Sequence, residues 1–404
     1  IGKHTRKSGD MLEAALTAGL CSMGAKVIPL GVVPTPAVAY LTRYYKADAG
    51  VVISASHNPC EYNGIKFFNS DGYKLSDGIE NEIESYILGE KAIEELPTHG
   101  KVGYVSANHN AVEDYVAFAV STIDCRLDGM KIAVDCANGA SYETAFKALN
   151  KLGANVEAIH NTPDGVNINH MCGSTHMESL QAYVTSIGAD IGIAFDGDAD
   201  RMLAVDENGK LIDGDQIMAA CAKFMRDNGT LKQNTLVATV MSNLGLFMAG
   251  EKIGINIPRT KVGDRYVLEE MLAKGYNIGG EQSGHIIFLD HNTTGDGLVS
   301  ALQFLSVLKK TGMKASEAAS IVTVMPQVLR NAVVKLENKN SYMENEEIAA
   351  ACKALEDEFA GEGRVLIRPS GTEPLVRVMI EGKDEEYITK KAEELAELIE
   401  KILG

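Results

Sequence analysis

Short apolar runs alternate along this chain with longer stretches in which apolar residues recur at helical spacing. The first copy of the pattern starts in residues 1–2, continues through Leu12, Leu16 and Leu20 on one helical face, and stops at Gly24. A glycine at such a helix end supplies the left-handed residue that many helix C-termini need. Each copy therefore predicts a strand, a helix, a glycine stop and a next strand.

Two further copies follow the first, at a spacing too long for a solenoid. The second has a strand over Lys131–Asp135 and a glycine stop at Gly153, and the third has a strand over 236–241 and a stop at Gly254. Strands and helices that alternate in this way build mixed, largely parallel sheets covered by helices. We therefore predict an α/β protein with three related domains.

The C-terminal part of the chain breaks this pattern. Strands are expected over 364–368 and 375–380 on either side of a polar loop, followed by a charged amphipathic helix over about 385–403. This indicates a fourth, α+β domain. The predicted domains are 1–110, 111–209, 210–323 and 324–404.

Composition narrows the class of protein. The chain has 404 residues and a net charge of −17, which argues against broad binding to nucleic acid or to anionic membranes. Its seven cysteines are scattered and form no CxxC pair, so we expect reduced thiols in a cytoplasm. No apolar stretch reaches the length of a membrane helix and no signal peptide is seen. Because the chain opens on Ile1 inside an expected strand, we also expect its natural N-terminus to lie upstream.

A serine follows the apolar run 50–53 on a tight turn. The segment reads Ser54-Ala55-Ser56-His57-Asn58-Pro59, so a strand delivers Ser56 to an exposed position with His57 beside it. A hydroxyl held there could carry a phosphoryl group. A lone serine at a strand exit is more often an ordinary polar residue, and His57 more often a hydrogen-bonding partner. Lys66, which could return on a hairpin, raises the odds of catalysis.

Three carboxylates at alternate positions form a second candidate. Asp196, Asp198 and Asp200 lie between two apolar runs, and such a set suits Mg²⁺, which prefers oxygen ligands. A calcium-binding EF-hand loop also begins in this way and would find Glu207 at its twelfth position. However, its sixth residue is usually glycine and is Arg201 here, and the flanking runs resemble strands rather than helices. Mg²⁺ is therefore the expected ion.

Two polar loops complete the candidate chemistry. In the first, Glu281 and Ser283 could grip neighbouring sugar hydroxyls, with His285 beside them and the cations Lys261 and Arg265 upstream, although surface charge is the ordinary explanation of such cations. The second loop could bind phosphate through guanidinium groups, hydroxyls and backbone N–H groups, or could be a β-hairpin with capped ends. Its residues are Arg368, Ser370, Gly371, Thr372 and Arg377.

These four segments, in this order and spread over essentially the whole chain, resemble the α-D-phosphohexomutases. The resemblance implies three related α/β domains and a fourth domain similar to the TATA-binding-protein fold, arranged around a central cleft. It implies that Ser56 works as a phosphoserine and that one Mg²⁺ per chain is held by Asp196, Asp198, Asp200 and the serine phosphate. It also suggests a homodimer.

The resemblance further implies a reaction. A hexosamine 6-phosphate and 1-phosphate would interconvert through a hexosamine 1,6-bisphosphate, feeding UDP-N-acetylglucosamine and peptidoglycan synthesis. Lys66, with His57 as the alternative, would act as general acid/base, and Arg201 would offset charge on the moving phosphoryl group. The sugar loop would read hydroxyls in either orientation, and the Arg368–Arg377 loop would hold the phosphate that is not reacting.

The chain departs from the family pattern at its start. The family's glycine-rich opening segment has no match, and the usual Arg-Asp-Thr-Arg appears as Lys3-His4-Thr5-Arg6. Only Arg6 carries over, as an expected phosphate contact.

Two alternatives remain open. One is a relative that acts on glucose or mannose phosphates, because no residue visibly reads the sugar 2-position. The other is a metal-binding regulatory protein that binds a sugar phosphate without catalysis, although such a protein has no need of Ser56 on an exposed turn.

Overall fold

A computed structural model describes residues 1–93, 95–107, 110–342, 344–370 and 373–404. The chain forms two compact units. The first contains Ile1–Met241 and Gly254–Ile321, and the second contains Ser242–Ile253 and Val322–Gly404.

Three sheets of the first unit share one strand order. The sheets run β2-β1-β3-β4, β6-β5-β7-β8-β9 and β11-β10-β12-β13. In each sheet the first three strands are parallel and the fourth pairs antiparallel with the third. The common order confirms that the chain contains three copies of one α/β unit.

The strands of these sheets are short. Their bounds are β1 Gly2–Lys3, β2 Gly31–Val32, β3 Ala49–Ile53, β4 Ile65–Asn69, β5 Lys131–Asp135, β6 Asn155–Ile159, β7 Ile191–Phe195, β8 Met202–Asp206, β9 Leu211–Ile212, β10 Val237–Thr239, β11 Arg259–Thr260, β12 Ile278–Gly280 and β13 Ile286–Phe288.

Helices cover the three sheets. The helices of the first unit are α1 Ser8–Ser22, α2 Thr35–Tyr44, α3 Asp77–Ile87, α4 Ala111–Ser121, α5 Ser141–Lys151, α6 Glu178–Ile187, α7 Gly214–Asp227, α9 Asp264–Lys274, α10 Gly297–Thr311 and α11 Ala315–Ala319, with short 3₁₀ turns η1 His99–Lys101, η2 Gly173–Thr175 and η3 Lys232–Asn234.

The glycine stops confirm the repeat at the level of single residues. Gly24, Gly153 and Gly254 have φ values of +85°, +88° and +68°, a region that residues with a side chain rarely adopt. The strands expected directly after two of these stops are wrong in detail. Val27 makes only an isolated bridge to Val105, and the regular strand β2 comes later in the chain. Asn256 likewise makes only a bridge before β11.

The shared topology places the candidate loops at equivalent positions. The strands β3, β7 and β12 each end at a hairpin that leads into the antiparallel fourth strand. These three hairpins carry Ser56, the Asp196–Asp200 cluster and Glu281 respectively. Carboxyl ends of parallel strands are where α/β sheets bind ligands. The same point of each repeat therefore supplies a different part of the candidate site.

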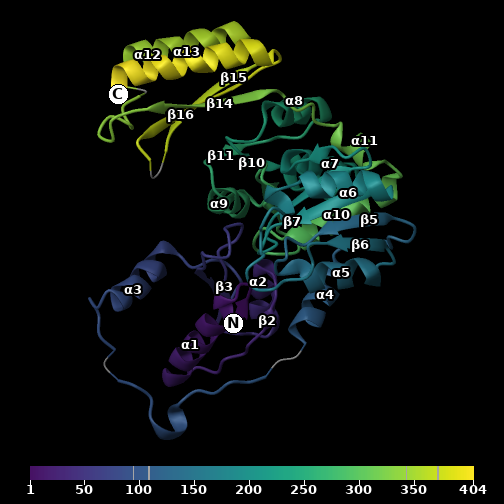
Figure 1. The fold of residues 1–404 in the computed structure, drawn as a ribbon, viewed down its shortest axis with the longest axis vertical. Helices are drawn as coiled ribbons and strands as arrows, with labels where there is room; N and C mark the ends of the chain where they lie inside the picture. Colours follow the sequence, from purple (N-terminus) through teal and green to yellow (C-terminus); the bar gives the residue numbers. More distant parts are fainter. Residues whose placement is uncertain (94, 108–109, 343, 371–372) are drawn as a thin grey trace. The chain divides into compact units, whose positions relative to one another are not determined.

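The second unit is an antiparallel sheet with helices on one side. Its elements are β14 Gln327–Val333, β15 Arg364–Pro369, β16 Leu375–Glu381, α8 Leu244–Ile253, α12 Glu346–Phe359 and α13 Glu385–Leu403. The strand order is β14-β16-β15, and Figure 1 shows α12 and α13 on the same face of the sheet. Buried apolar residues of the sheet and of both helices form one core. This confirms the expected α+β domain.

One helix of the third repeat belongs to this second unit. The backbone N–H of Leu244, at the start of α8, donates to Glu381 Oε2 at 3.2 Å, and Arg364 Nη2 donates to the Ser242 carbonyl at 2.7 Å. The boundary predicted near 323 did not anticipate that part of the third segment would group with the fourth. The predicted boundaries otherwise stay predictions.

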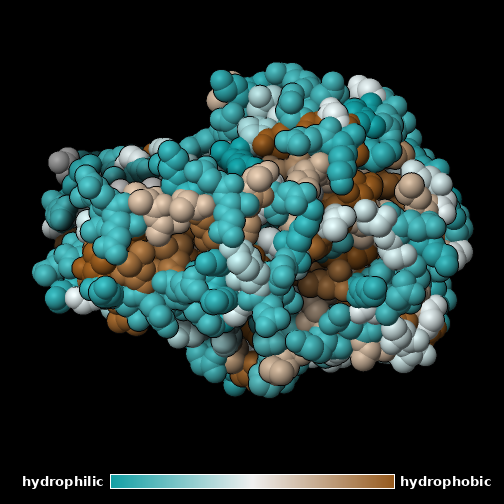
Figure 2. Space-filling view, turned by 90° about the horizontal axis from the view of Figure 1, so that it is seen from above, coloured by the Kyte–Doolittle hydropathy of each residue, from teal (hydrophilic) through white to brown (hydrophobic). Residues whose placement is uncertain are grey.

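The face of the surface drawn in Figure 2 is mostly hydrophilic, and hydrophobic residues gather in separate patches between the hydrophilic ones. Among the described residues, no helix combines the length and the apolar character that crossing a membrane requires.

Candidate active site

Ser56 lies in the hairpin between β3 and β4 with an unusual backbone. Its φ is +49°, a left-handed value that is uncommon for a serine and is concentrated at functional sites. The hairpin also confirms the expected return of Lys66, which pairs with Val52 across the two strands. The local fold therefore presents a serine and a lysine at one end of the first sheet.

The Ser56 hydroxyl lies against the acidic cluster of the second domain. Its Oγ is 2.9 Å from Asp198 Oδ1 and 3.1 Å from Asp196 Oδ2. The two segments, well over a hundred positions apart in the chain, are thus in direct contact. This is the juxtaposition that phosphoryl transfer at Ser56 requires.

Asp198 is the centre of the hydrogen-bond network around the serine. Its Oδ2 accepts from Lys66 Nζ at 2.8 Å and from Thr35 Oγ1 at 3.0 Å. The Ser54 hydroxyl lies 3.3 Å from the same oxygen and accepts the Ser56 N–H at 2.9 Å. Asp198 is fully buried, so its charge depends on these donors.

The carboxylates of this cluster titrate differently. Burial, together with the charges of Asp198 and Asp200, raises the pKa of Asp196 well above its ordinary value. Burial opposes the charge of Asp198 too, but Lys66, His4 and the hydrogen bonds to this carboxylate together outweigh burial and hold the pKa of Asp198 well below its ordinary value. Asp196 therefore binds a proton more readily than an ordinary carboxyl when no cation shares the cluster.

The cluster fits a divalent metal. Asp196, Asp198 and Asp200 each offer a carboxylate oxygen, and these atoms all lie within 4.8 Å of one another. Asp200 Oδ1 is buried and makes no hydrogen bond in the described part of the chain. Three buried carboxylates with an orphaned oxygen are what a hard cation would satisfy.

The calcium-loop alternative is wrong. The cluster is flanked by strands β7 and β8 rather than by helices. Glu207, which would be the twelfth residue of an EF-hand, instead accepts hydrogen bonds from the backbone and hydroxyl of Ser316.

Arg201 lies beside both the cluster and His57. Its backbone N–H donates to Asp196 Oδ1 at 3.2 Å, and its Nη1 lies 3.1 Å from His57 Nδ1. Burial and the neighbouring Arg201 charge lower the pKa of His57, so the ring is neutral near pH 7. Because arginine can only donate, His57 Nδ1 accepts, and the neutral ring then carries its proton on Nε2.

The sugar loop adjoins the metal loop. The Gly284 carbonyl accepts the Met202 N–H at 3.0 Å, and His285 Nδ1 lies 3.5 Å from Asp200 Oδ2. His285 is only 3% exposed and accepts the Gly295 N–H at Nε2 (3.2 Å). His285 thus packs beneath the loop, whereas the expectation was a substrate contact.

Of the four other residues predicted in and beside the sugar loop, two make polar contacts within the protein. Glu281 Oε1 accepts the Gly263 N–H at 3.1 Å, and Ser283 is exposed. Lys261 is exposed and lies over the Tyr266 ring. Arg265 pairs with Asp77 and, at 2.8 Å, with Glu269. Glu281 and Ser283 thus keep the expected position, while Arg265 is engaged in surface ion pairs.

Arg6 donates to backbone carbonyls, whereas the expectation was a phosphate contact. Its Nη2 donates to the carbonyls of Ser56 at 3.0 Å and Asn58 at 2.7 Å, and the residue is 2% exposed. Its Nε and Nη1 are buried and make no hydrogen bond among the described residues. Arg6 therefore supports the serine loop from below, a contact that the sequence did not indicate.

The expected phosphate loop belongs to the second unit. Arg368 and Arg377 lie directly opposite each other on β15 and β16, and burial together with the Arg377 charge lowers the pKa of Arg368. Arg377 Nη2 donates to Glu373 at 3.1 Å, and Lys339 Nζ donates to the Ser370 carbonyl at 2.8 Å. Two facing guanidinium groups favour an anion between them. Gly371 and Thr372 lie outside the described residues.

A second cluster of possible ligands, Asp135, His160 and Cys172, serves as a structural brace. Asp135 Oδ2 accepts the Gly173 N–H at 2.9 Å and lies 2.9 Å from His160 Nδ1, so its capacity is used within the protein. Burial and the charge of Asp135 raise the pKa of the Cys172 thiol to about 12, which disfavours the thiolate that a metal needs. The brace joins the two ends of the segment 160–172.

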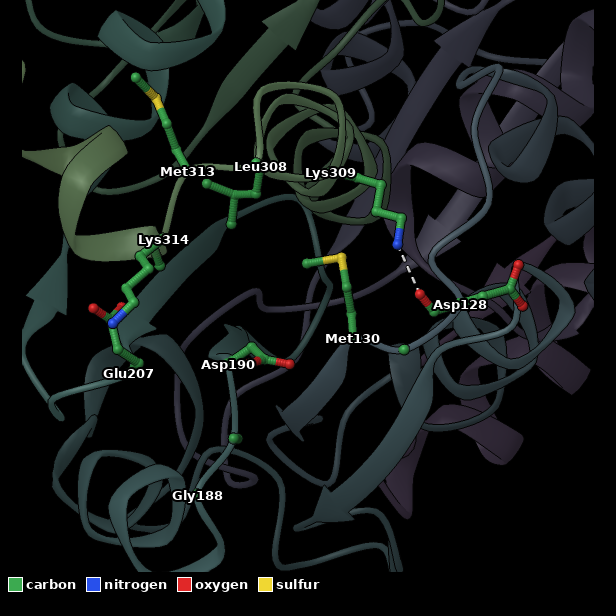
Figure 3. A pocket seen from close by; sticks show the side chains of 13 residues that line it. Asp128, Met130, Gly188, Asp190, Glu207, Leu308, Lys309, Met313 and Lys314 are labelled. Atoms are coloured by element: carbon green, nitrogen blue, oxygen red, sulfur yellow. Dashed lines mark hydrogen bonds between the residues drawn. The ribbon is translucent and has the colours of Figure 1, made fainter.

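A cavity of about 680 Å³ lies near the end of the second sheet at which β5 and β7 begin. Figure 3 shows Asp128, Met130 and Asp190 near the starts of β5 and β7, with Lys309 donating to the Asp128 carbonyl. The candidate site follows the carboxyl end of β7. The cavity is therefore separate from the candidate active site.

Four residues of the network escaped sequence reasoning. Ser54 stands two residues before Ser56 in the same segment, and this position could have indicated a role. Thr35 opens a helix after a proline, and His4 and Asn169 stand in ordinary polar runs, so no local pattern marks them. Their contacts arise from tertiary structure: Thr35 and Ser54 to Asp198, His4 to Thr35, and Asn169 to the serine loop.

Burial of His4 predicts acid sensitivity. His4 is 2% exposed, and burial lowers its pKa to about 3. The unfolded chain takes up this proton below about pH 6.5, whereas the folded protein does so only near pH 3. Stability is therefore present above pH 6.5 and lost as the pH falls, by about 2 kcal/mol between pH 7 and pH 5.

Urea unfolding at pH 7 and pH 5 measures this loss. His4→Gln should remove about 2 kcal/mol of the pH dependence, while His99→Gln, at an exposed histidine, should leave it unchanged. An identical pH dependence in the wild type and the His4 variant would contradict the assignment.

Comparison with known proteins follows the same division into four. Models of the phosphoglucomutase/phosphomannomutase family match the chain as alpha/beta/alpha domain I over residues 1–94, domain II over 112–209, domain III over 213–325 and the C-terminal domain over 332–398. The chain belongs to this family.

Relatives with curated names agree on one member of the family. The chain is 63% identical over 400 residues to the phosphoglucosamine mutase of Ruminiclostridium cellulolyticum, covering 99% of this chain and 89% of that protein. It is 62% identical over 404 residues to that of Acetivibrio thermocellus, covering 100% and 90%.

Solved structures share the fold at low sequence identity. A phosphoglucomutase/phosphomannomutase family protein from Burkholderia thailandensis is 22% identical, with a TM-score of 0.81 and coverage of 98% of this chain and 88% of that one. The N-acetylphosphoglucosamine mutase of Aspergillus fumigatus, solved with GlcNAc-6P and magnesium, is 19% identical, with a TM-score of 0.67 and coverage of 92% and 93%. Both support the architecture of the chain.

Proposed function

We propose that this protein is an isomerase with phosphoglucosamine mutase activity, interconverting glucosamine 6-phosphate and glucosamine 1-phosphate. The observation that carries the proposal is the contact of the Ser56 hydroxyl with Asp198 and Asp196, at 2.9 and 3.1 Å. The relatives more than 60% identical to the chain, all named phosphoglucosamine mutase, support the choice of sugar.

In the proposed reaction, Ser56 carries a phosphoryl group. The free hydroxyl of the sugar phosphate attacks the phosphorus, the bond from phosphorus to Ser56 Oγ breaks, and the proton of the attacking hydroxyl leaves to a base while Oγ gains one. The product is a hexosamine 1,6-bisphosphate. The bisphosphate turns over and returns its other phosphoryl group to Ser56 by the reverse of the same step.

Lys66 is the preferred acid/base. Burial lowers its pKa, but the charges of Asp198 and Asp200 raise it by more, so the amine is protonated and can give a proton to the departing Ser56 oxygen. His57 is the weaker alternative, because Arg201 occupies Nδ1 and the proton stands on Nε2. Arg201 is placed to offset negative charge at the phosphoryl group.

Asp196, Asp198 and Asp200 are proposed to hold one Mg²⁺ together with the phosphate on Ser56. When bound, the ion would stabilise the negative charge that spreads over the transferring phosphoryl group. Two observations support the assignment: Asp200 Oδ1 is buried without a hydrogen bond and has Arg201 Nε at 3.9 Å, and the pKa of Asp196 is raised by burial and by the neighbouring carboxylates; a cation would relieve both features.

The remaining predicted contacts keep their proposed roles. Glu281 and Ser283 would bind sugar hydroxyls, with Lys261 available nearby. In the C-terminal unit, Arg368, Ser370 and Arg377 would bind a phosphate group. We also propose a homodimer and a cytoplasmic location, in agreement with seven free cysteines.

The choice of sugar is tested by turnover of glucosamine, glucose and mannose phosphates under identical conditions. We expect kcat/KM to be at least about tenfold higher for glucosamine phosphate. A clear preference for glucose or mannose phosphate would defeat the assignment but leave the phosphoserine chemistry standing. Binding of glucosamine phosphate without turnover of any sugar would favour the non-catalytic alternative.

A further inference from the structure

We propose that Asn169 is a positioning residue for phosphoryl transfer, holding the Ser56 loop in its reactive conformation against the metal loop. The inference rests on the proposed function, because it assigns to Asn169 the task of placing the serine that carries the phosphoryl group. Asn169 lies in the segment 160–172 of the second domain and contacts the first domain through its side chain.

The contacts of Asn169 are to the backbone of the serine loop. Its Nδ2 donates to the Ser56 carbonyl at 3.0 Å and to the Asn58 carbonyl at 2.9 Å. Arg6 Nη2 donates to the same two carbonyls, at 3.0 and 2.7 Å. Two donors from different domains therefore hold one turn of backbone.

The orientation of the Asn169 amide follows from its surroundings. Asn169 is 8% exposed, its Oδ1 is buried and makes no hydrogen bond among the described residues, and rotating the amide would instead turn this oxygen toward two carbonyl oxygens, which repel it. Its φ is +59°, which asparagine tolerates better than most residues. The backbone N–H of Asn169 donates to the Ala137 carbonyl at 2.9 Å. Both the backbone and the side chain of this residue are thus fixed.

The segment that carries Asn169 is itself anchored. Its two ends, His160 and Cys172, meet at the buried Asp135, which accepts the Gly173 N–H and lies 2.9 Å from His160 Nδ1. Because both ends of the segment are held in this way, the segment can keep the serine loop in place instead of moving with it.

The metal loop is shaped to admit this contact. A side chain at Gly197 would come within 2.6 Å of Asn169 Nδ2 and 2.8 Å of the Ser56 carbonyl oxygen. Gly197 stands between Asp196 and Asp198, so the absence of its side chain lets the carboxylates, Asn169 and Ser56 meet. Asn169 therefore fixes the distance between the phosphoryl carrier and the acidic cluster.

The need for such a restraint lies in the conformation of Ser56. A serine at φ +49° is held against its own preference, and when Asn169 is lost the Ser56 carbonyl keeps only the Arg6 donor, so the peptide can relax toward ordinary conformations. Such a relaxation would move Oγ away from Asp196 and Asp198. Because Asn169 is 8% exposed and its amide is bound to the Ser56 and Asn58 carbonyls, we expect this displacement of the reacting group to cost rate rather than substrate binding.

The test compares Asn169→Gly and Asn169→Asp with the wild type. Glycine accepts φ +59° without strain, so this variant removes the side chain without forcing the backbone, although it also gives the backbone more freedom. Aspartate keeps the shape but cannot donate. We expect kcat to fall about 10- to 100-fold in both, and KM to change less than about threefold. Phosphoryl transfer to Ser56 from a hexose bisphosphate, followed by intact-protein mass spectrometry, should slow by the same factor.

A matched control separates positioning from loss of structure. Asn167→Ala alters the same segment, but among the described residues the Asn167 side chain bonds only to the Thr162 carbonyl and the Asp164 N–H. We expect this variant to keep kcat within about twofold. The amides of the Ser56 loop should exchange hydrogen faster in the Asn169 variants than in Asn167→Ala.

Three results would overturn the proposal about Asn169, and a fourth would defeat the proposed function instead. A normal kcat in either folded Asn169 variant, or an equal loss in Asn167→Ala, overturns the proposal. A rise in KM with unchanged kcat overturns it as well. A wild-type protein without mutase activity defeats the proposed function instead.

Discussion

Replacement of Ser56 with alanine is expected to lower mutase turnover by at least about 10⁴-fold. The variant has no oxygen at this position to carry the phosphoryl group. The fold should persist, because the hydroxyl contributes hydrogen bonds worth about 1 kcal/mol each and fills no core position. Coupled assay of sugar 1-phosphate formation measures the loss.

The matched control is Ser70→Ala, at an exposed serine just beyond β4 in the same domain. This control should retain full activity. A Ser56 variant that turns over at more than a hundredth of the wild-type rate would show that the phosphoryl group travels by another route.

Removal of divalent metal is expected to abolish activity and to lower the thermal stability of the first unit. Asp196 and Asp198 are buried beside Asp200, so their mutual repulsion is relieved either by a proton or by a cation. Restoring Mg²⁺ at about a hundred times its Kd should stabilise the protein by about 2.7 kcal/mol. Chelation followed by Mg²⁺ titration, read by activity and by thermal unfolding, measures both effects.

The affinity for Mg²⁺ should also depend on pH. The pKa of Asp196 is raised well above its ordinary value, so metal binding must displace its proton, and the affinity falls as the pH is lowered. Asp200→Asn should weaken binding, whereas Glu207→Gln, at the residue a calcium loop would use, should not. Mg²⁺ binding that is unaffected by Asp200→Asn would place the ion elsewhere.

Sequence periodicity was sufficient to predict the repeated architecture. Buried strands such as Ile191–Phe195 read as short apolar runs, and the left-handed glycines at Gly24, Gly153 and Gly254 mark helix ends because few other residues adopt that conformation. The short strand β2, Gly31–Val32, could not be placed, because two paired residues leave no periodic signal.

The candidate site was predictable where one segment carries several functional groups. Ser56 and Lys66 share a hairpin, and the three aspartates share one loop, so local spacing sufficed. Asn169 could not be found in this way. Its role depends on two backbone carbonyls of another domain, and no feature of its own neighbours encodes that meeting.

The burial of His285 likewise depends on a contact that its sequence neighbours do not reveal. Its place in the sugar loop suggested a substrate contact, yet its ring packs against Gly295, where a side chain would come within 2.4 Å. A glycine ten positions away thus decides that the histidine lies inside rather than at the surface.

Mass spectrometry of the intact protein, with mapping of the modified peptide, tests the central assignment most directly. The protein incubated with glucosamine 1,6-bisphosphate or glucose 1,6-bisphosphate and Mg²⁺ should gain the mass of one phosphoryl group, located on Ser56 and transferable to added glucosamine 6-phosphate. An actively turning-over protein that never carries this group, or that carries it on another residue, would contradict the account.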